Sequence, residues 1–197
     1  MKKKELELLL QTVPGFEDPD PSLEQYPTPA TIAADILFNA YSRGDVAGMK
    51  VIDLGCGTGV FSIGAGLLGA ETVIGYDISE PAIGIAKKAA ANLGSRADFR
   101  VADVSDVDEG ADTVFMNPPF GCQTRSADRR FLDKAMEIAE CVYSVHMAGT
   151  LGFLEGYVRE RGRRIVYDKT YKYDIPHTFG FHKKERRTID IVVVNIR

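Results

Sequence analysis

The chain has 197 residues, of which 45% are hydrophobic, and a formal net charge of −4. This length suits one well-buried α/β domain and is short for two. No segment approaches the roughly 20 apolar residues that cross a bilayer, so we expect no membrane association. The three cysteines and three histidines share no metal-ligand spacing. We therefore expect reduced thiols, a cytoplasmic protein and no metal site.

The N-terminal part is expected to form a helical arm. Residues 1–14 have the pattern of a short amphipathic helix, and an irregular connector rich in proline follows them. A second helix is predicted for residues 31–42. We take residues 1–48 as this arm and residues 49–197 as a Rossmann-like core, both within one domain.

From residue 50 onward, segments with strand composition alternate with segments that suit helices. This alternation predicts a parallel sheet with crossover helices. Two β-rich segments near the C-terminus predict an antiparallel hairpin at the sheet edge. The expected fold class is α/β, with a seven-stranded, mostly parallel sheet and a C-terminal antiparallel hairpin, as in Rossmann-like class I methyltransferases. The expected strands are 50–54, 72–76, 98–102, 112–116, 141–146, 163–173 and 187–196, and expected helices between them include 60–68, 81–92 and 127–140.

A glycine-rich loop, Gly55 to Gly59, joins the first of these strands to a helix. Its glycines let the backbone approach a ligand closely, and the helix N-terminus supplies unpaired N–H groups. The nicotinamide fingerprint needs its third glycine one residue later. Asp53 would repel a pyrophosphate and attract a sulfonium or an ammonium. The loop therefore favours S-adenosylmethionine over a nicotinamide dinucleotide.

The ends of the next two strands complete the expected cofactor site. Asp77 lies where the ribose hydroxyls of a nucleoside would lie. Ile78 can cover an adenine face, and Asp103 can accept a hydrogen bond from the adenine amino group. The expected cofactor-binding residues of the core are Asp53, Gly55, Cys56, Gly57, Gly59, Asp77, Ile78, Asp103, Val104 and Asn117.

The segment Asn117-Pro118-Pro119-Phe120 follows the expected strand 112–116. Two prolines stiffen this loop, so the Asn117 carboxamide and the Pro118 carbonyl can act as acceptors toward one NH2 group. Two acceptors favour a pyramidal nitrogen and stabilise the positive charge that grows on it. Phe120 would stack on a planar substrate. A rigid Pro-Pro turn with a buried Phe would have the same sequence. The expected catalytic residues are Asn117, Pro118, Pro119 and Phe120.

The glycine loop and the Asn-Pro-Pro-Phe segment together resemble the amino-methyltransferase branch of the class I enzymes. Leu23 to Pro29 and the Phe-His-Lys-Lys segment at 181–184 resemble the methyltransferase-like protein five family over nearly the whole chain. Eukaryotic members of that family make N6-methyladenosine in small-subunit ribosomal RNA. The resemblance implies adenine N6 in RNA, in small-subunit rRNA, as the substrate. It also implies that Gln25, Tyr26 and Thr28 line the cofactor pocket, although the family's Thr-Arg-Pro is Thr28-Pro29 here.

Two partners follow from composition and resemblance. Residues 159–197 carry a net charge of +6 while the rest of the chain carries −10. Interleaved cations and aromatic rings can contact phosphates and unpaired bases, although a solvated basic face has a similar composition. The resemblance also implies a small zinc-binding activator subunit, which would extend the sheet at residues 98–102. The residues expected to contact RNA are Phe181, His182, Lys183, Lys184 and Arg186.

Three other functions remain open at this stage. A protein glutamine N5-methyltransferase would use the same Asn-Pro-Pro segment, but such enzymes usually carry Tyr in place of Phe120 and a larger N-terminal domain. A DNA adenine methyltransferase would normally have a separate target-recognition region, and none is visible. A non-catalytic RNA-binding protein that retains the fold would not need an intact Asn117-Pro118-Pro119-Phe120 segment.

Overall fold

The computed structural model describes residues 1–20, 23–120, 127–176 and 186–197. They form a seven-stranded sheet in the order β3-β2-β1-β4-β5-β7-β6. The strands are β1 (Lys50–Leu54), β2 (Thr72–Asp77), β3 (Asp98–Val101), β4 (Ala111–Met116), β5 (Ala139–Met147), β6 (Ile165–Pro176) and β7 (Arg186–Ile196). Strands β1 to β5 pair in parallel, whereas β7 is antiparallel to both β5 and β6. The expected α/β class and the C-terminal hairpin are confirmed.

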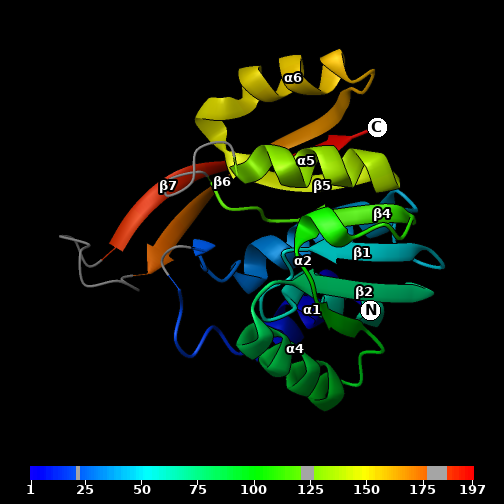
Figure 1. Cartoon of the computed structure of the whole chain (residues 1–197). Coiled ribbons are helices and arrows are strands. Elements are labelled where there is room, and N and C mark those ends of the chain that lie inside the picture. The colour runs from blue at the N-terminus through cyan, green and yellow to red at the C-terminus, as the bar shows by residue number, and fades with distance from the viewer. Residues whose placement is uncertain (21–22, 121–126, 177–185) are drawn as a thin grey trace.

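Helices cover both faces of the sheet. The α-helices are α1 (Lys3–Leu10), α2 (Ala30–Ser42), α3 (Val60–Leu67), α4 (Glu80–Leu93), α5 (Ala127–Ile138) and α6 (Leu151–Glu160), and short 3₁₀ turns lie at η2 (Val104–Asp106) and η3 (Ala148–Thr150). Figure 1 shows α5 and α6 on one side of the strands and α4 on the other. No helix among the described residues has the length and apolarity that a membrane span needs.

Two helices differ from the sequence prediction. Helix α1 ends at Leu10 rather than at residue 14, because Thr12 and Val13 are β-branched and Val13 precedes a proline, which disfavours helical backbone. Helix α6 was not predicted, because Gly152 and Gly156 lower the helix propensity of its sequence. Burial of Leu154 stabilises α6 against the sheet.

Two hydrophobic clusters fill the space between the sheet and these helices. One cluster joins α1, α2, α3 and α4 to one face, and the other joins α5 and α6 to the opposite face. Strand β7 contributes to both clusters because its side chains alternate, with Val193 in the first and Val194 in the second. Leu6 and Leu10 of α1 are buried in the first cluster, so the N-terminal arm shares its core with the sheet.

The strand register brings the expected site residues to one edge of the sheet. Leu54 at the end of β1 pairs with Tyr76 of β2 and with Met116 of β4. The residues that follow these three, which are Gly55, Asp77 and Asn117, therefore emerge side by side. In an open α/β sheet this carboxyl edge is where ligands bind.

Candidate active site

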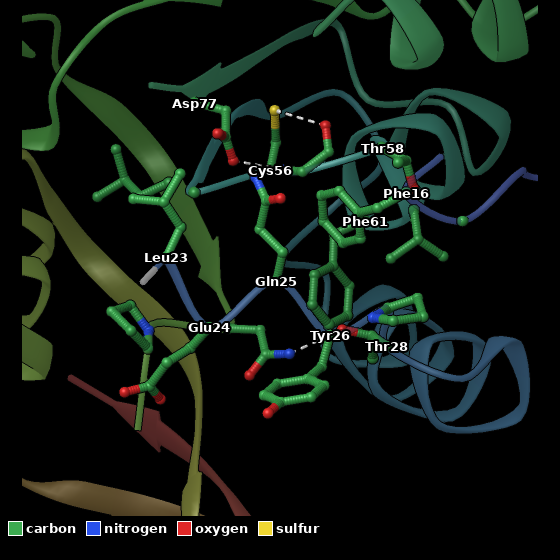
Figure 2. A pocket seen from close by; sticks show the side chains of 18 of the residues that line it. Phe16, Leu23, Glu24, Gln25, Tyr26, Thr28, Cys56, Thr58, Phe61 and Asp77 are labelled. Carbon is green, nitrogen blue, oxygen red and sulfur yellow. Dashed lines mark hydrogen bonds between the residues drawn. The ribbon is translucent and has the colours of Figure 1, made fainter. Parts of the chain in front are cut away.

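A cavity of about 750 Å³ lies at this carboxyl edge. Its volume suits a ligand the size of a nucleoside that carries an amino-acid group. One wall consists of the glycine loop and the strand ends. The opposite wall consists of the part of the N-terminal arm that lies between α1 and α2. Figure 2 shows the cavity with arm residues Gln25, Tyr26 and Thr28 together with Cys56 and Asp77 from the loop wall.

The glycine loop is held by backbone hydrogen bonds and by unusual backbone angles. The N–H groups of Gly55 and Cys56 both donate to the Tyr76 carbonyl, at 2.8 and 2.9 Å. Gly57 has a φ of +54°, and a Cβ added there would lie 2.9 Å from Cζ of Phe16. Such a conformation and such a close approach both favour glycine. Gly55, Cys56 and Gly57 line the cavity, and Phe16 lies over the loop from the arm.

Two residues predicted from the loop lie behind the cavity wall. Gly59 is the N-cap of α3 and has a φ of +90°, and a Cβ there would meet Phe99 and Ala86 at 2.8 and 3.1 Å. Asp53 is 1% exposed, and its Oδ2 accepts from the N–H and the hydroxyl of Ser62, at 3.0 and 2.6 Å. Neither is among the described residues that line the cavity, so their contact with the cofactor stays a prediction.

The Asp53 carboxyl group is electrostatically unusual. Burial raises its pKa to about 7, against the lowering effect of the two hydrogen bonds from Ser62. Its Oδ1 has no hydrogen-bond partner among the described residues. The bonds from Ser62 tie the end of β1 to the first turn of α3. Asp53 therefore fixes the position of the helix that follows the loop.

The ends of β2 and β3 supply the acidic part of the cavity. Asp77 accepts from the N–H of Gly57 and from that of Ser79, both at 2.8 Å, and burial raises its pKa. Each carboxylate oxygen has two lone pairs, so Asp77 retains acceptor capacity for ribose hydroxyls. Ile78 is 54% exposed although it lines the cavity, which leaves an apolar surface for a ligand ring. Val104, beside Asp103, also lines the cavity.

Asp103 makes a contact that the sequence did not predict. Its Oδ1 accepts from the N–H of Ser105 at 2.9 Å and from Arg130 at 2.7 Å. The Ser105 N–H and the Arg130 guanidinium lower the pKa of Asp103, although partial burial opposes them. Arg130 belongs to α5 and lines the cavity. Arg130 is paired with Asp103, which lies 27 positions earlier in the sequence. No local sequence pattern therefore indicates that Arg130 belongs to the site.

The arm wall is fastened to the rest of the molecule by side chains. Gln25 is 8% exposed, and its Oε1 accepts from the N–H of Asp20 at 2.8 Å. The hydroxyl of Tyr173, on β6, donates to the carbonyl of Pro27 at 3.0 Å. Tyr26 and Thr28 line the cavity with Gln25, at the positions that the family resemblance implies.

The Asn117 segment lies where the two walls meet. Asn117 and Pro119 line the cavity, whereas Pro118 is buried. The side-chain N–H of Asn117 donates to Oγ1 of Thr28 at 2.9 Å. Asn117 Oδ1 is buried and has no hydrogen-bond partner among the described residues. The site therefore contains an acceptor oxygen whose amide donor is already paired.

Phe120 packs against the hydrophobic core beside the cavity. Its ring is partly buried against the hydrophobic cluster on the α1 to α4 face, and Phe120 is not among the described residues that line the cavity. Its backbone N–H donates to Oε2 of Glu24 at 2.7 Å. Stacking of Phe120 on a substrate base thus stays a prediction.

Comparisons with known proteins fit this geometry. A family model described as a methyltransferase domain matches residues 45–167. The chain is 36% identical to rRNA N(6)-adenosine-methyltransferase METTL5 of Danio rerio, over 100% of this chain and 98% of that protein. The METTL5 protein of Drosophila melanogaster is 36% identical over 97% of this chain and 94% of its own length. The chain belongs to the METTL5 family of methyltransferases. The resemblance to the methyltransferase-like protein five family is thereby confirmed.

Archaeal proteins are also similar to this METTL5-family chain. An uncharacterized protein of Methanocaldococcus jannaschii is 40% identical over 100% of this chain and 94% of its own length. A crystal structure from Pyrococcus horikoshii, described as that of a candidate RNA methyltransferase, has a TM-score of 0.93 at 40% identity. The match covers 100% of this chain and 97% of that one. The fold therefore agrees with that of a solved relative.

The cofactor of this METTL5-family enzyme is S-adenosylmethionine, which supplies a methyl group on a positively charged sulfur. The cavity suits it in three ways. The glycine loop allows close approach of the backbone, Asp77 offers carboxylate lone pairs to ribose, and Ile78 offers an apolar face to adenine. The carboxylates Asp77 and Asp103 would repel a pyrophosphate.

The predicted RNA-contacting residues of this METTL5-family enzyme cannot be placed in the site. Phe181, His182, Lys183 and Lys184 lie outside the described residues, and Arg186 is described only as the first residue of β7.

Among the described residues, no group of three or more His, Cys, Asp or Glu side chains is arranged to hold a metal ion.

Proposed function

We propose that this enzyme transfers the methyl group of S-adenosylmethionine to the N6 amino group of adenine in ribosomal RNA. The observation that carries the proposal is the Asn117 amide. Its oxygen is buried without a partner in a side chain that lines the cavity. A buried acceptor without a partner is costly, so it suits a ligand that brings an N–H group. The names of the METTL5 relatives specify N(6)-adenosine of rRNA as their target.

The proposed reaction needs little acid–base chemistry from the protein. The amino nitrogen of adenine is a poor nucleophile because its lone pair is delocalised into the ring. When Asn117 Oδ1 accepts one of its hydrogens, the nitrogen is held toward the methyl group, and the positive charge that develops on it is stabilised. The new N–C bond forms as the C–S bond breaks with its electron pair on sulfur. One amino proton then leaves to solvent.

We propose small-subunit rRNA as the RNA, with Lys183 and Lys184 as contacts. Cationic side chains that meet phosphates release counterions, so their removal weakens binding and reduces its salt dependence. The double variant Lys183→Ala/Lys184→Ala should bind rRNA more weakly, with a flatter salt dependence, while its affinity for S-adenosylmethionine stays the same. Unchanged RNA affinity would remove these two lysines from the proposal.

We also propose that a small zinc-binding subunit adds to the sheet at β3. Strand β3 is the outermost strand on its side, and Val101 is 52% exposed. The N–H of Ala102 donates to Asp77 of β2, so by alternation the N–H of Val101 points away from the sheet. Val101→Pro would remove that outward donor. It should abolish co-purification with the co-expressed zinc-binding subunit, and retained binding would contradict strand addition at β3.

The function is tested by offering three acceptors to the purified enzyme with tritiated S-adenosylmethionine. The acceptors are small ribosomal subunits, total RNA and a release-factor peptide that contains the glutamine substrate of N5-methyltransferases. The proposal predicts label in the RNA of the ribosomal subunits or in total RNA. Label in the peptide would favour glutamine methylation. No transfer to any acceptor would favour a non-catalytic RNA-binding protein.

A further inference from the structure

Two side chains of the arm contact the Asn117 segment where the two walls of the cavity meet. Oγ1 of Thr28 accepts from the side-chain N–H of Asn117 at 2.9 Å, across 89 positions in the sequence. Oε2 of Glu24 accepts from the backbone N–H of Phe120 at 2.7 Å, across 96 positions. The arm that lines the cofactor cavity therefore also holds the first and last residues of the Asn117-Pro118-Pro119-Phe120 segment.

The backbone on either side of Thr28 is unusually restricted. Pro27 and Pro29 flank it, and Pro29 is the N-cap of α2, with a φ of −57°. A residue that precedes proline is confined to extended backbone, and a β-branched side chain has few rotamers. The Pro27 carbonyl is further tied to β6 by the hydroxyl of Tyr173 at 3.0 Å. The Thr28 hydroxyl is consequently held in place before any ligand binds.

The orientation of the Asn117 amide determines what the site can bind. The two ends of a carboxamide are similar in size, but one end donates hydrogen bonds and the other accepts them. An amino group on the substrate needs the oxygen end. When the oxygen is committed to the substrate, the Asn117 N–H needs another acceptor, and the Thr28 hydroxyl is that acceptor. A buried N–H without a partner would raise the free energy of the reactive arrangement.

We propose that Thr28 is a positioning residue for methyl transfer. Its hydroxyl pairs the Asn117 amide N–H and so leaves Oδ1 available to the amino group of the substrate. This inference rests on the proposed role of Asn117. It differs from the role in cofactor binding that the family resemblance implies for Thr28, because the described hydroxyl contact is with the Asn117 side chain.

The test compares Thr28→Val, which has nearly the same shape without the hydroxyl, with Thr28→Ser, which keeps the hydroxyl. Single-turnover methyl transfer to rRNA is measured with both substrates saturating, and the affinity for S-adenosylmethionine is measured by calorimetry. Thr28→Val should slow transfer by about 10- to 100-fold, the rate equivalent of one unpaired buried N–H. The affinity for S-adenosylmethionine should change by less than about two-fold because the described partner of the removed hydroxyl is the Asn117 amide. Thr28→Ser should recover most of the lost rate.

Three results would overturn the inference, and each is distinguishable. A Thr28→Val enzyme as fast as the unchanged enzyme would show that the hydroxyl is not needed. A rate that falls only in proportion to cofactor affinity, and that recovers at higher S-adenosylmethionine, would make Thr28 a cofactor ligand. An unchanged enzyme that binds S-adenosylmethionine but labels no adenine would overturn the proposed function, and this inference with it.

Discussion

Each of the two walls of the cavity is fixed in place by a different kind of interaction. The loop wall is fixed by backbone hydrogen bonds between adjacent strands, such as those from Gly55 and Cys56 to Tyr76. The arm wall is fixed by side-chain bonds to residues 89 and 96 positions away. The loop wall thus depends on two neighbouring parallel strands and the loop that follows the first of them, whereas the arm wall exists only in the complete fold. We expect changes in the loop wall to alter cofactor affinity and changes at the arm contacts to alter methyl transfer.

The largest effect is expected where the two walls meet. Asn117→Ala removes the amide oxygen that is proposed to accept from the substrate amino group. Removal of one such preorganised hydrogen-bonding group typically slows catalysis by about 10²- to 10³-fold. Calorimetry should show nearly unchanged binding of S-adenosylmethionine, while label transfer to rRNA falls by that factor. An Asn117→Ala enzyme with full activity would refute the role of the amide.

A large effect on stability is expected from Asp53, under the loop wall. Its folded-state pKa of about 7 exceeds its ordinary value of 3.8, so the folded protein binds a proton that the unfolded chain releases. The free energy of unfolding should therefore fall as pH rises from about 4 to about 7. Asp53→Asn removes this titration.

The measurement is urea unfolding of both proteins at pH 5 and pH 8. Relative to Asp53→Asn, the unchanged protein should lose about 1–3 kcal/mol of stability between these two values. A stability difference between the two proteins that is the same at pH 5 and pH 8 would mean that Asp53 titrates normally. Any hydrogen bonds from Ser62 to the substituted side chain contribute equally to stability at the two pH values.

A smaller effect, on cofactor affinity, is expected from Gly57→Ala. The new Cβ would lie 2.9 Å from Phe16 on a backbone with a φ of +54°, so the loop or the ring must shift. Strain of about 1–2 kcal/mol corresponds to about a ten-fold weaker affinity for S-adenosylmethionine. Gly84→Ala is the matched control, because a Cβ there meets no atom within 4 Å and α4 favours alanine. Equal cofactor affinity in the two variants would contradict the expected contact of the loop with cofactor.

The smallest effect is expected from Glu24→Ala at the arm wall. This change removes the acceptor for the Phe120 N–H, which can pair partly with water instead. Methyl transfer should slow by about five-fold, while the affinity for S-adenosylmethionine changes less. Glu24→Gln keeps an acceptor oxygen and should slow transfer less than Glu24→Ala. A larger loss of cofactor affinity than of transfer rate would contradict the proposed separation between the walls.

The loop wall was predictable from sequence, whereas the contacts of the arm wall were not. Strand-like segments, alternating glycines and Asp77 form local patterns, and the parallel register then brings their ends together. The pairing of Thr28 with Asn117 depends on the path of the arm across the sheet edge. Resemblance to a family implied that Thr28 lines the cofactor pocket, but the partner of its hydroxyl became visible only in the folded chain.

Some motif residues serve the fold at positions where a cofactor contact was expected. Gly59 is glycine because Phe99 and Ala86 leave no room for a side chain. Asp53 bonds to Ser62 at the start of α3. A sequence pattern cannot separate such roles from ligand contacts, because packing and binding both favour the same residues at the same positions.

The central claim is that this METTL5-family enzyme methylates adenine N6 in rRNA. The most direct test supplies S-adenosylmethionine with a deuterated methyl group to the purified enzyme and small-subunit rRNA, followed by mass spectrometry of the released nucleosides. The account predicts deuterium in N6-methyladenosine. Deuterium in another methylated nucleoside, or only in protein, would contradict it.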